Sequence, residues 1–290
     1  MVPHQKIPLP EERPGRARPE GERPGGARPE GRTAPPQLPP VIGHRGAAAS
    51  APENTLAGLR RAKALGCRWV EFDVRLTGDG ALVLCHDSRL DRTTNGSGLV
   101  SATSLAAVRE LDAGTWFDPG FAGERVPTLD EALLLASELD LGANIEIKSD
   151  RGREYATAAA VATTVQRLRG RAPAVLVSSF LLAALAALRD LAPQIPRGAL
   201  FRSIPRGWGE VAHGIGCMMI GSDHRRLRPR RIAAIRAAGY RLSAYTVNDP
   251  ARARLLFDWG VTSVFSDAPD ILCAVSAGHI RTLARQGAMR

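Results

Sequence analysis

The sequence of 290 residues has few aromatic residues and few cysteines, and it has no long hydrophobic run. The cysteines, Cys67, Cys85, Cys217 and Cys273, are widely spaced and form no C-x-x-C pair, so we expect buried reduced thiols rather than a zinc site or a disulfide framework. No segment reaches the roughly 20 apolar residues that span a bilayer. The N-terminus also lacks the apolar core of a secretory signal. We therefore expect a cytoplasmic protein with no stable membrane insertion.

The net charge is +10, and arginines are densest between residues 225 and 231. A basic surface can attract nucleic acid, anionic membranes or anionic small molecules. No nucleic-acid-binding signature accompanies the charge. We therefore interpret the arginine-rich run as a solvated face and expect no nucleic-acid partner.

Residues 1–39 are rich in proline, glycine, arginine and glutamate. Residues 12–21 read ERPGRARPEG, and residues 22–31 repeat this with a single change. Such a composition cannot bury enough apolar surface to offset the chain entropy lost on folding. We expect a disordered tail that acts as a passive extension, and its sequence identifies no partner.

From residue 40 to residue 290, short apolar runs alternate with helical patterns, the first helix being expected over residues 53–65. Repeated βα units predict a parallel sheet covered by helices. Polar residues gather where the strands end, which favours an α/β fold of the (β/α)₈ TIM-barrel type, with a doubly wound open sheet as the alternative. The candidate strands cover residues 41–43, 69–74, 81–85, 144–147, 174–177, 198–201, 217–220, 241–245 and 262–265.

One of these strands is too many for an eight-stranded wall. Only residues 77–80 link Val74–Leu76, at the end of the second apolar run, to residues 81–85, and four residues are too few for a parallel crossover. A hairpin folded about Gly78 and Asp79 fits instead, and it would bring His86 roughly opposite Glu71. The following residues, about 88–126, lack the βα rhythm and predict a small insertion over the barrel mouth.

Three carboxylates lie within apolar strands. Glu71 and Asp73 are two residues apart, so both side chains point to the same face. Like charges this close repel each other unless a cation lies between them, and Glu146 supplies a third acid. Three carboxylates without a cysteine or histidine pair are typical of a site for Mg²⁺ or Ca²⁺. The alternative is a set of structural salt bridges with nearby basic residues, namely Arg68, Arg75 and Lys148.

Two histidines, His44 and His86, each follow a predicted strand. A pair of imidazoles near carboxylates suits acid–base chemistry close to neutral pH. Arg45 and Lys148 are fixed cations expected at the same face, and both side chains bind phosphate oxygens well. These residue types together indicate metal-assisted chemistry on a phosphodiester.

The motifs IGHRG, PENT, EFDVRLTGDGALVLCHDSRLDRTTNGSG, NIEIK, SSF, YTVN and SDAP follow one another in this order. As an ordered set, they resemble the glycerophosphodiester phosphodiesterase family from about Val41 to Asp270. This resemblance implies a TIM barrel, one divalent cation, and hydrolysis of a small-molecule glycerophosphodiester to sn-glycerol 3-phosphate and an alcohol.

The resemblance also implies roles for particular residues. They are the metal ligands Glu71, Asp73 and Glu146, the general base and acid His44 and His86, the phosphate-binding Arg45 and Lys148, and the supporting residues Glu53 and Asn54.

The chain departs from the family pattern at Tyr245, where tryptophan is frequent, and at Ser266, where threonine is frequent. Both positions are expected in the pocket wall, so they bear on the preferred alcohol. Two alternative functions stay open. One is a lysophospholipase D or a phosphoinositide phospholipase C-like enzyme that uses the same site. The other is a catalytically silent barrel that binds phosphate-bearing ligands.

Overall fold

The computed structural model describes residues 36–273, in which eight parallel strands form a closed barrel. The first strand pairs with both the second and the last parallel strand, which closes the sheet. The predicted (β/α)₈ barrel is therefore confirmed, and the open sheet is excluded. The wall consists of β1 Val41–Gly43, β2 Trp69–Leu76, β4 Gly142–Ile147, β5 Val175–Ser179, β6 Arg197–Phe201, β7 Met219–Asp223, β8 Arg241–Tyr245 and β9 Ser263–Ser266.

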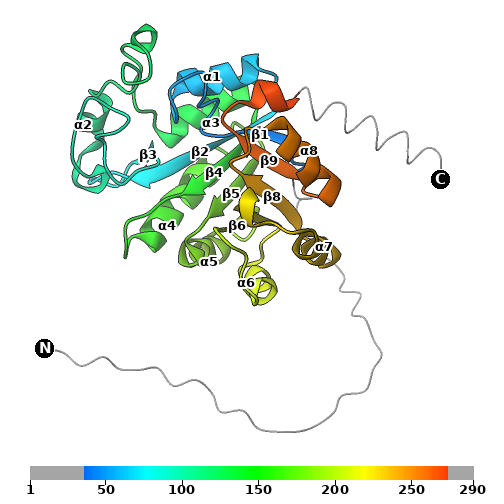
Figure 1. The fold of residues 1–290 in the computed structure, drawn as a ribbon. Coiled ribbons are helices and arrows are strands. Elements are labelled where there is room, and N and C mark those ends of the chain that lie inside the picture. Colours follow the sequence, from blue (N-terminus) through cyan, green and yellow to red (C-terminus); the bar gives the residue numbers. More distant parts are fainter. Residues whose placement is uncertain (1–35, 274–290) are drawn as a thin grey trace, which may run out of the picture. The chain divides into compact units, whose positions relative to one another are not determined.

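Helices surround the central strands (Figure 1), and their apolar sides are buried against the wall. In α3, for example, Leu129, Ala132, Leu133 and Ala136 follow the helical period and are fully buried. The surrounding helices are α1 Leu56–Ala64, α3 Leu129–Glu138, α4 Glu154–Arg167, α5 Leu182–Leu191, α6 Trp208–Ile215, α7 Pro229–Ala237 and α8 Pro250–Trp259, and a short 3₁₀ helix, η3 His224–Arg226, follows β7.

Helix α1 begins three residues later than the predicted start at Glu53. Asn54 has a left-handed φ of 57°, which cannot continue into a right-handed helix. Thr55 then caps the helix, because its Oγ1 accepts a hydrogen bond from the Gly58 N–H at 3.1 Å. Glu53 and Asn54 are thereby kept in the loop that follows β1.

The extra strand is the second arm of a hairpin. β3 Leu82–Leu84 runs antiparallel to β2, with Val74 opposite Leu84, so the predicted hairpin is confirmed. The chain between β3 and α3 forms the insertion, and it has a small apolar core of its own that includes Leu90, Val100 and Val108. Its regular elements are η1 Val100–Ala102, α2 Leu105–Arg109 and η2 Pro119–Phe121.

The interior of the barrel is packed below the strand ends. Trp69 alternates with Glu71 and Asp73 on the inward face of β2, and its ring lies over Gly142 of β4. A Cβ at Gly142 would come within 2.1 Å of the indole, so this position requires glycine. The bulky ring fills the barrel beneath the acids and closes it from that side.

The last residues of the predicted tail contact the barrel. The carbonyl of Pro39 accepts a hydrogen bond from Ser263 Oγ at 2.7 Å, and that of Pro40 accepts one from the Val264 N–H at 2.8 Å. Leu38 packs against the interior cluster of the barrel. Residues 36–39 thus contact the barrel, whereas residues 1–35, which hold the repeat, lie outside the described residues.

A capping box begins α3. Thr128 Oγ1 accepts a hydrogen bond from the Glu131 N–H at 3.2 Å, and Glu131 Oε2 accepts one from the Thr128 N–H at 2.8 Å. This reciprocal pair satisfies two amides that the first helical turn leaves without partners.

We predict that Thr128→Ala lowers the free energy of unfolding by about 1 kcal/mol, because the capping hydroxyl is lost. Urea unfolding of both proteins measures the difference. Ser137→Ala, at an exposed position of the same helix, is the matched control and should leave stability nearly unchanged. Equal losses in the two variants would contradict the capping role.

Candidate functional site

A cavity of about 180 Å³ opens at the carboxyl ends of the barrel strands, where TIM-barrel enzymes carry their chemistry. Its wall divides into a charged part and an apolar part. The charged part consists of His44, Arg45, Glu71, His86, Glu146 and Lys148, and the apolar part includes Phe180, Leu200, Tyr245 and Phe265. Larger hollows lie beside the insertion and at the opposite end of the barrel, but neither contains the acid cluster.

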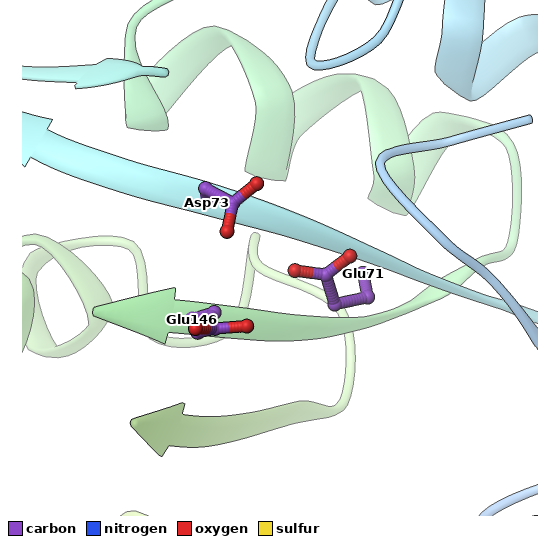
Figure 2. Close-up of side chains that lie close together, drawn as sticks. All are labelled: Glu71, Asp73 and Glu146. Carbon is purple, nitrogen blue, oxygen red and sulfur yellow. The ribbon is translucent and has the colours of Figure 1, made fainter. Parts of the chain in front are cut away.

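Glu71 and Asp73 of β2 point toward Glu146 of β4 (Figure 2). The two strands are parallel neighbours, and their register sets Asp73 directly opposite Glu146. One oxygen from each of the three acids lies within 4.8 Å of the others, although all three side chains are buried. The structure therefore brings together the three acids that the sequence suggested as ligands of one cation.

Burial and mutual repulsion dominate the electrostatics of this cluster. Burial, followed by the nearby Asp73 carboxylate, raises the pKa of Glu71 to about 8. Burial and Asp73 also raise the pKa of Glu146, against the opposing effect of Lys148. The pKa of Asp73 is lowered despite its burial, because Lys148 and Arg45 stabilise its charge. Two of the three acids thus lack enough positive charge around them.

The structural salt bridges considered above are present only in part. Lys148 Nζ forms an ion pair with Glu146 and lies 3.4 Å from Asp73 Oδ1. Arg75 turns away to Asp150 instead, at 3.1 Å.

The donor set fits a hard divalent cation. Glu71 Oε1 and Asp73 Oδ1 are buried without a hydrogen bond, whereas Glu146 Oε1 is held by Lys148 Nζ. Lys148 Nζ also forms an ion pair with Asp73 Oδ1, at 3.4 Å. Carboxylate oxygens that converge in this way are the ligands that Mg²⁺ and Ca²⁺ prefer.

His44 lies where barrel closure joins β1 to β9. Gly43 pairs with Ser266, so the residues that follow them, His44 and Asp267, are brought side by side. The Asp267 carboxylate lies 2.6 Å from His44 Nδ1, and Asn248 Nδ2 donates to its other oxygen at 2.9 Å. Burial lowers the pKa of His44, but Glu71 and Asp267 outweigh it and the net shift is upward.

Asp267 belongs to the SDAP motif, but the sequence indicated no separate role for it. The available signal was the order of the strands, because a closed barrel must place its last strand beside its first.

His86 enters the same cavity from the hairpin. The Cys85 N–H donates to the Asp73 carbonyl at 3.1 Å, so His86 leaves β3 at the end of β2 that carries the acids. Its Nδ1 lies 2.7 Å from Asp87 Oδ1. Burial lowers the pKa of His86, and Arg45 and Lys148 add to this effect while Asp73 opposes it. The two imidazoles thus have pKa values shifted in opposite directions.

A chain of ion pairs joins Arg45 to His86 behind the cavity. Arg45 Nη1 lies 2.8 Å from Glu53 Oε1, and Arg92 binds both the other oxygen of Glu53, at 2.7 Å, and Asp87, at 2.6 Å. Arg92 comes from the insertion, and sequence reasoning missed it. The chain fixes the β1 loop and the β3 loop relative to each other.

Glu53 and Asn54 do not line the cavity. Glu53 instead binds Arg45, which lines the cavity, and Asn54 binds Asp73, which lies just behind the lining. Asn54 Nδ2 donates to Asp73 Oδ2 at 3.0 Å, and the Asp73 N–H donates to Asn54 Oδ1 at the same distance. The Asn54 side chain therefore binds both the backbone and the side chain of Asp73. Glu53 in turn positions the guanidinium of Arg45.

The family model described as "Glycerophosphoryl diester phosphodiesterase family" matches residues 44–271, which contain every residue of the site. The chain belongs to this family. A glycerophosphodiester phosphodiesterase of Caldanaerobacter subterraneus is 34% identical, and the match covers 80% of this chain and 95% of that one. One from Bacillus subtilis is 33% identical, with coverages of 82% and 87%.

Solved structures agree with this assignment. A phosphodiesterase of Oleispira antarctica, in complex with the product sn-glycerol-3-phosphate, matches with a TM-score of 0.79 and 40% identity, over 82% of this chain and 96% of that chain. A glycerophosphodiester phosphodiesterase of Agrobacterium tumefaciens matches with a TM-score of 0.70 and 32% identity, over 82% of this chain and 100% of that chain.

The family and the enzyme class expected from the motifs, a phosphoric diester hydrolase, are thus confirmed. The family and its acid cluster together indicate a divalent metal, without distinguishing Mg²⁺ from Ca²⁺. Within residues 36–273, no helix has the length and apolar character needed to cross a bilayer. The cytoplasmic location stays a prediction.

We predict that Glu71→Gln raises the melting temperature of the chelator-treated protein at neutral pH. The amide keeps the shape of the side chain and removes one of three mutually repelling charges. A carboxyl whose pKa is raised in the folded state makes the protein less stable as the pH rises from the ordinary carboxyl pKa of 4.5 toward 8. The rise in melting temperature caused by Glu71→Gln should therefore grow over that interval.

Added Mg²⁺ or Ca²⁺ should then raise the melting temperature of the wild-type protein more than that of the variant, because a ligand that binds only the folded state stabilises it. Glu138→Gln, on the exposed surface of α3, is the control and should behave like the wild type. An equal cation effect in Glu71→Gln and wild type would show that Glu71 does not contribute to a cation site.

Proposed function

We propose that this member of the family hydrolyses water-soluble glycerophosphodiesters to sn-glycerol 3-phosphate and an alcohol. The observation that carries the proposal is the buried acid cluster, which shares one cavity with two histidines and two basic side chains. The product complex of the Oleispira antarctica relative supports the same substrate class. The small cavity, about 180 Å³, suits a compact substrate.

In this proposal, Glu71, Asp73 and Glu146 hold one divalent cation, Mg²⁺ or Ca²⁺. When bound, the cation would polarise the phosphoryl group and acidify the attacking hydroxyl. Asn54 keeps Asp73 in place through two hydrogen bonds of 3.0 Å, so the pocket of ligands is organised before any ion arrives.

His44 and His86 form the acid–base pair. Asp267 and Asp87 hold the Nδ1 atoms of the two rings, which leaves the Nε2 atoms for proton transfer. One ring removes the proton from the nucleophile, which is a water molecule or the glycerol 2-hydroxyl, and the second option gives a cyclic phosphate. The other ring protonates the leaving alkoxide.

Arg45 and Lys148 stabilise the negative charge that develops on the phosphoryl oxygens. Burial lowers the pKa of each, but neighbouring carboxylates outweigh it and raise the net value, so both side chains stay charged. A well-placed donor of this kind contributes a few kcal/mol to the stability of a transition state. The ion pair with Glu53 holds the guanidinium of Arg45 at the cavity wall.

The apolar part of the wall favours one alternative substrate. Phe180 is 41% exposed and packs edge-on against Tyr245 at the cavity rim, where an acyl chain could lie. A lysophospholipase D, or a phospholipase C-like enzyme acting on phosphoinositides, would use the same acids and histidines on such a substrate.

We predict that His44→Ala and His86→Ala each lower turnover of glycerophosphocholine at least 100-fold, because general acid–base catalysis contributes about 10²–10⁴-fold. His213→Ala, on the exposed side of α6, is the matched control and should retain activity. The assay should be repeated after chelation, with Mg²⁺ and Ca²⁺ restored separately. Near wild-type turnover in either variant, or full activity after chelation, would contradict the proposed mechanism.

The substrate class is tested with glycerophosphocholine and lysophosphatidylcholine in parallel. The proposal predicts a higher kcat/KM for the water-soluble diester. A higher value for the lysophospholipid would favour the alternative. Binding of glycerol 3-phosphate without turnover of any diester would favour a silent phosphate-binding barrel.

A further inference from the structure

We propose that Cys67 and Cys273 form a redox-sensitive dithiol that closes to a disulfide on reaction with small-molecule disulfides. All four cysteines carry thiols in the structure. Cys67 and Cys273 lie far apart in the sequence, yet their thiols are joined by a hydrogen bond. This contact lies outside the cavity and has no part in the proposed hydrolysis.

Barrel closure explains why the two thiols meet. Gly43 of β1 pairs with Val70 of β2 on one side and with Ser266 of β9 on the other. Cys67 lies just before β2, and its sulfur packs so close to Gly43 that a Cβ there would come within 3.3 Å of it. Residues 269–273 are helical and follow β9, which brings Cys273 to the same place. The pairing of three strands thus aligns the two cysteines.

The two thiols have different surroundings. Cys67 is only 2% exposed, whereas Cys273 is partly accessible. The hydrogen bond between them raises the pKa of Cys67, and burial adds to the rise. The same bond lowers the pKa of Cys273, against burial and the nearby Asp270 carboxylate. Cys273 has the easier access of the two thiols, and the downward direction of its pKa also suits an attacking thiol.

The reaction proceeds in two exchanges. The Cys273 thiolate attacks one sulfur of a disulfide RS–SR, which breaks the S–S bond, releases one RS⁻ and leaves Cys273 as a mixed disulfide. Cys67 then loses its proton, and its sulfur attacks Cys273 Sγ and releases the second RS⁻. The released thiolates take up the two protons. The protein loses two electrons and two protons, and the small disulfide gains them.

The other cysteines serve as internal controls. Cys85 is buried, and its thiol donates to the Asp87 carbonyl at 3.4 Å. Burial raises the pKa of Cys85 to about 12 and that of Cys217 to about 11. Neither thiol has the features that favour attack on a disulfide.

The first test uses the full chain, reduced and then exposed to 2-hydroxyethyl disulfide. Remaining thiols are alkylated, and the protein is analysed by intact mass and peptide mapping. We expect a loss of two hydrogens and a cross-linked peptide that contains Cys67 and Cys273, both reversed by dithiothreitol. The proposal would be overturned if Cys67 and Cys273 were both alkylated and the mixed disulfide lay on Cys217 or Cys85.

Variants separate the two roles. Cys67→Ser should stop at the mixed disulfide on Cys273, whereas Cys273→Ser should react about tenfold more slowly, because the remaining thiols are buried or, at the partly exposed Cys217, have a raised pKa. Cys217→Ser should cross-link like the wild type. Cross-linking lost in Cys217→Ser, or no adduct on Cys273 in Cys67→Ser, would contradict the assignment. Circular dichroism checks that each variant is folded.

Thermal unfolding supplies a readout independent of chemical mapping. A disulfide that closes a long loop stabilises a protein by restricting its unfolded chain. The oxidised wild-type protein should therefore melt at a higher temperature than the reduced protein, and Cys67→Ser should show no rise. An oxidised wild type that melts no higher would show that the cross-link does not fit the native fold.

Discussion

The repulsion among three buried carboxylates is the constraint on which the site depends. Glu71, Asp73 and Glu146 are held close together by the register of β2 and β4, in surroundings that penalise their charge. Lys148 offsets part of the repulsion at both Glu146 and Asp73, and Arg45 does so mainly at Asp73. The pKa values of Glu71 and Glu146 are raised first by burial and then by the repulsion that remains. A divalent cation among the acids would remove the remaining repulsion, and the folding free energy of the barrel is what keeps the acids together without it.

Closure of the barrel is the second constraint, and it places several functional side chains at once. The pairing of β1 with β9 brings the Asp267 carboxylate to His44. The same pairing brings the Cys273 thiol to Cys67 beside Gly43 of β1. A chain of ion pairs through Arg92 then ties the β1 loop to the hairpin that carries His86. The residues that surround the cavity are therefore positioned by long-range contacts rather than by a single local motif.

Features with local causes could be predicted from the sequence. The Thr128 capping box depends on residues three apart, and Asp249 caps α8 ahead of a first-turn proline, as such a pair predicts. The short connection between β2 and β3 permits only a hairpin, and the alternation of strands and helices favours a barrel. The convergence of the three acids was also predictable, because parallel strands align inward-facing residues.

Features that depend on tertiary contacts were missed or misplaced. The start of α1 was predicted too early, because Asn54 takes a left-handed conformation in order to bind Asp73. The roles of Asp267 and Arg92 follow from barrel closure and from the path of the insertion, neither of which has a local sequence signal. The contact between Cys67 and Cys273 likewise joins two distant segments.

Anomalous scattering from crystals soaked in Mn²⁺ would show whether the three acids hold a cation. The account predicts a single strong peak at the barrel mouth, bonded to one oxygen each of Glu71, Asp73 and Glu146 at about 2.0–2.6 Å, as for hard cations with oxygen ligands. Crystals of a Glu146→Gln variant should show a weaker peak or none. A peak held by other residues, or three acids paired only with Lys148 and Arg45 at saturating Mn²⁺, would contradict the account.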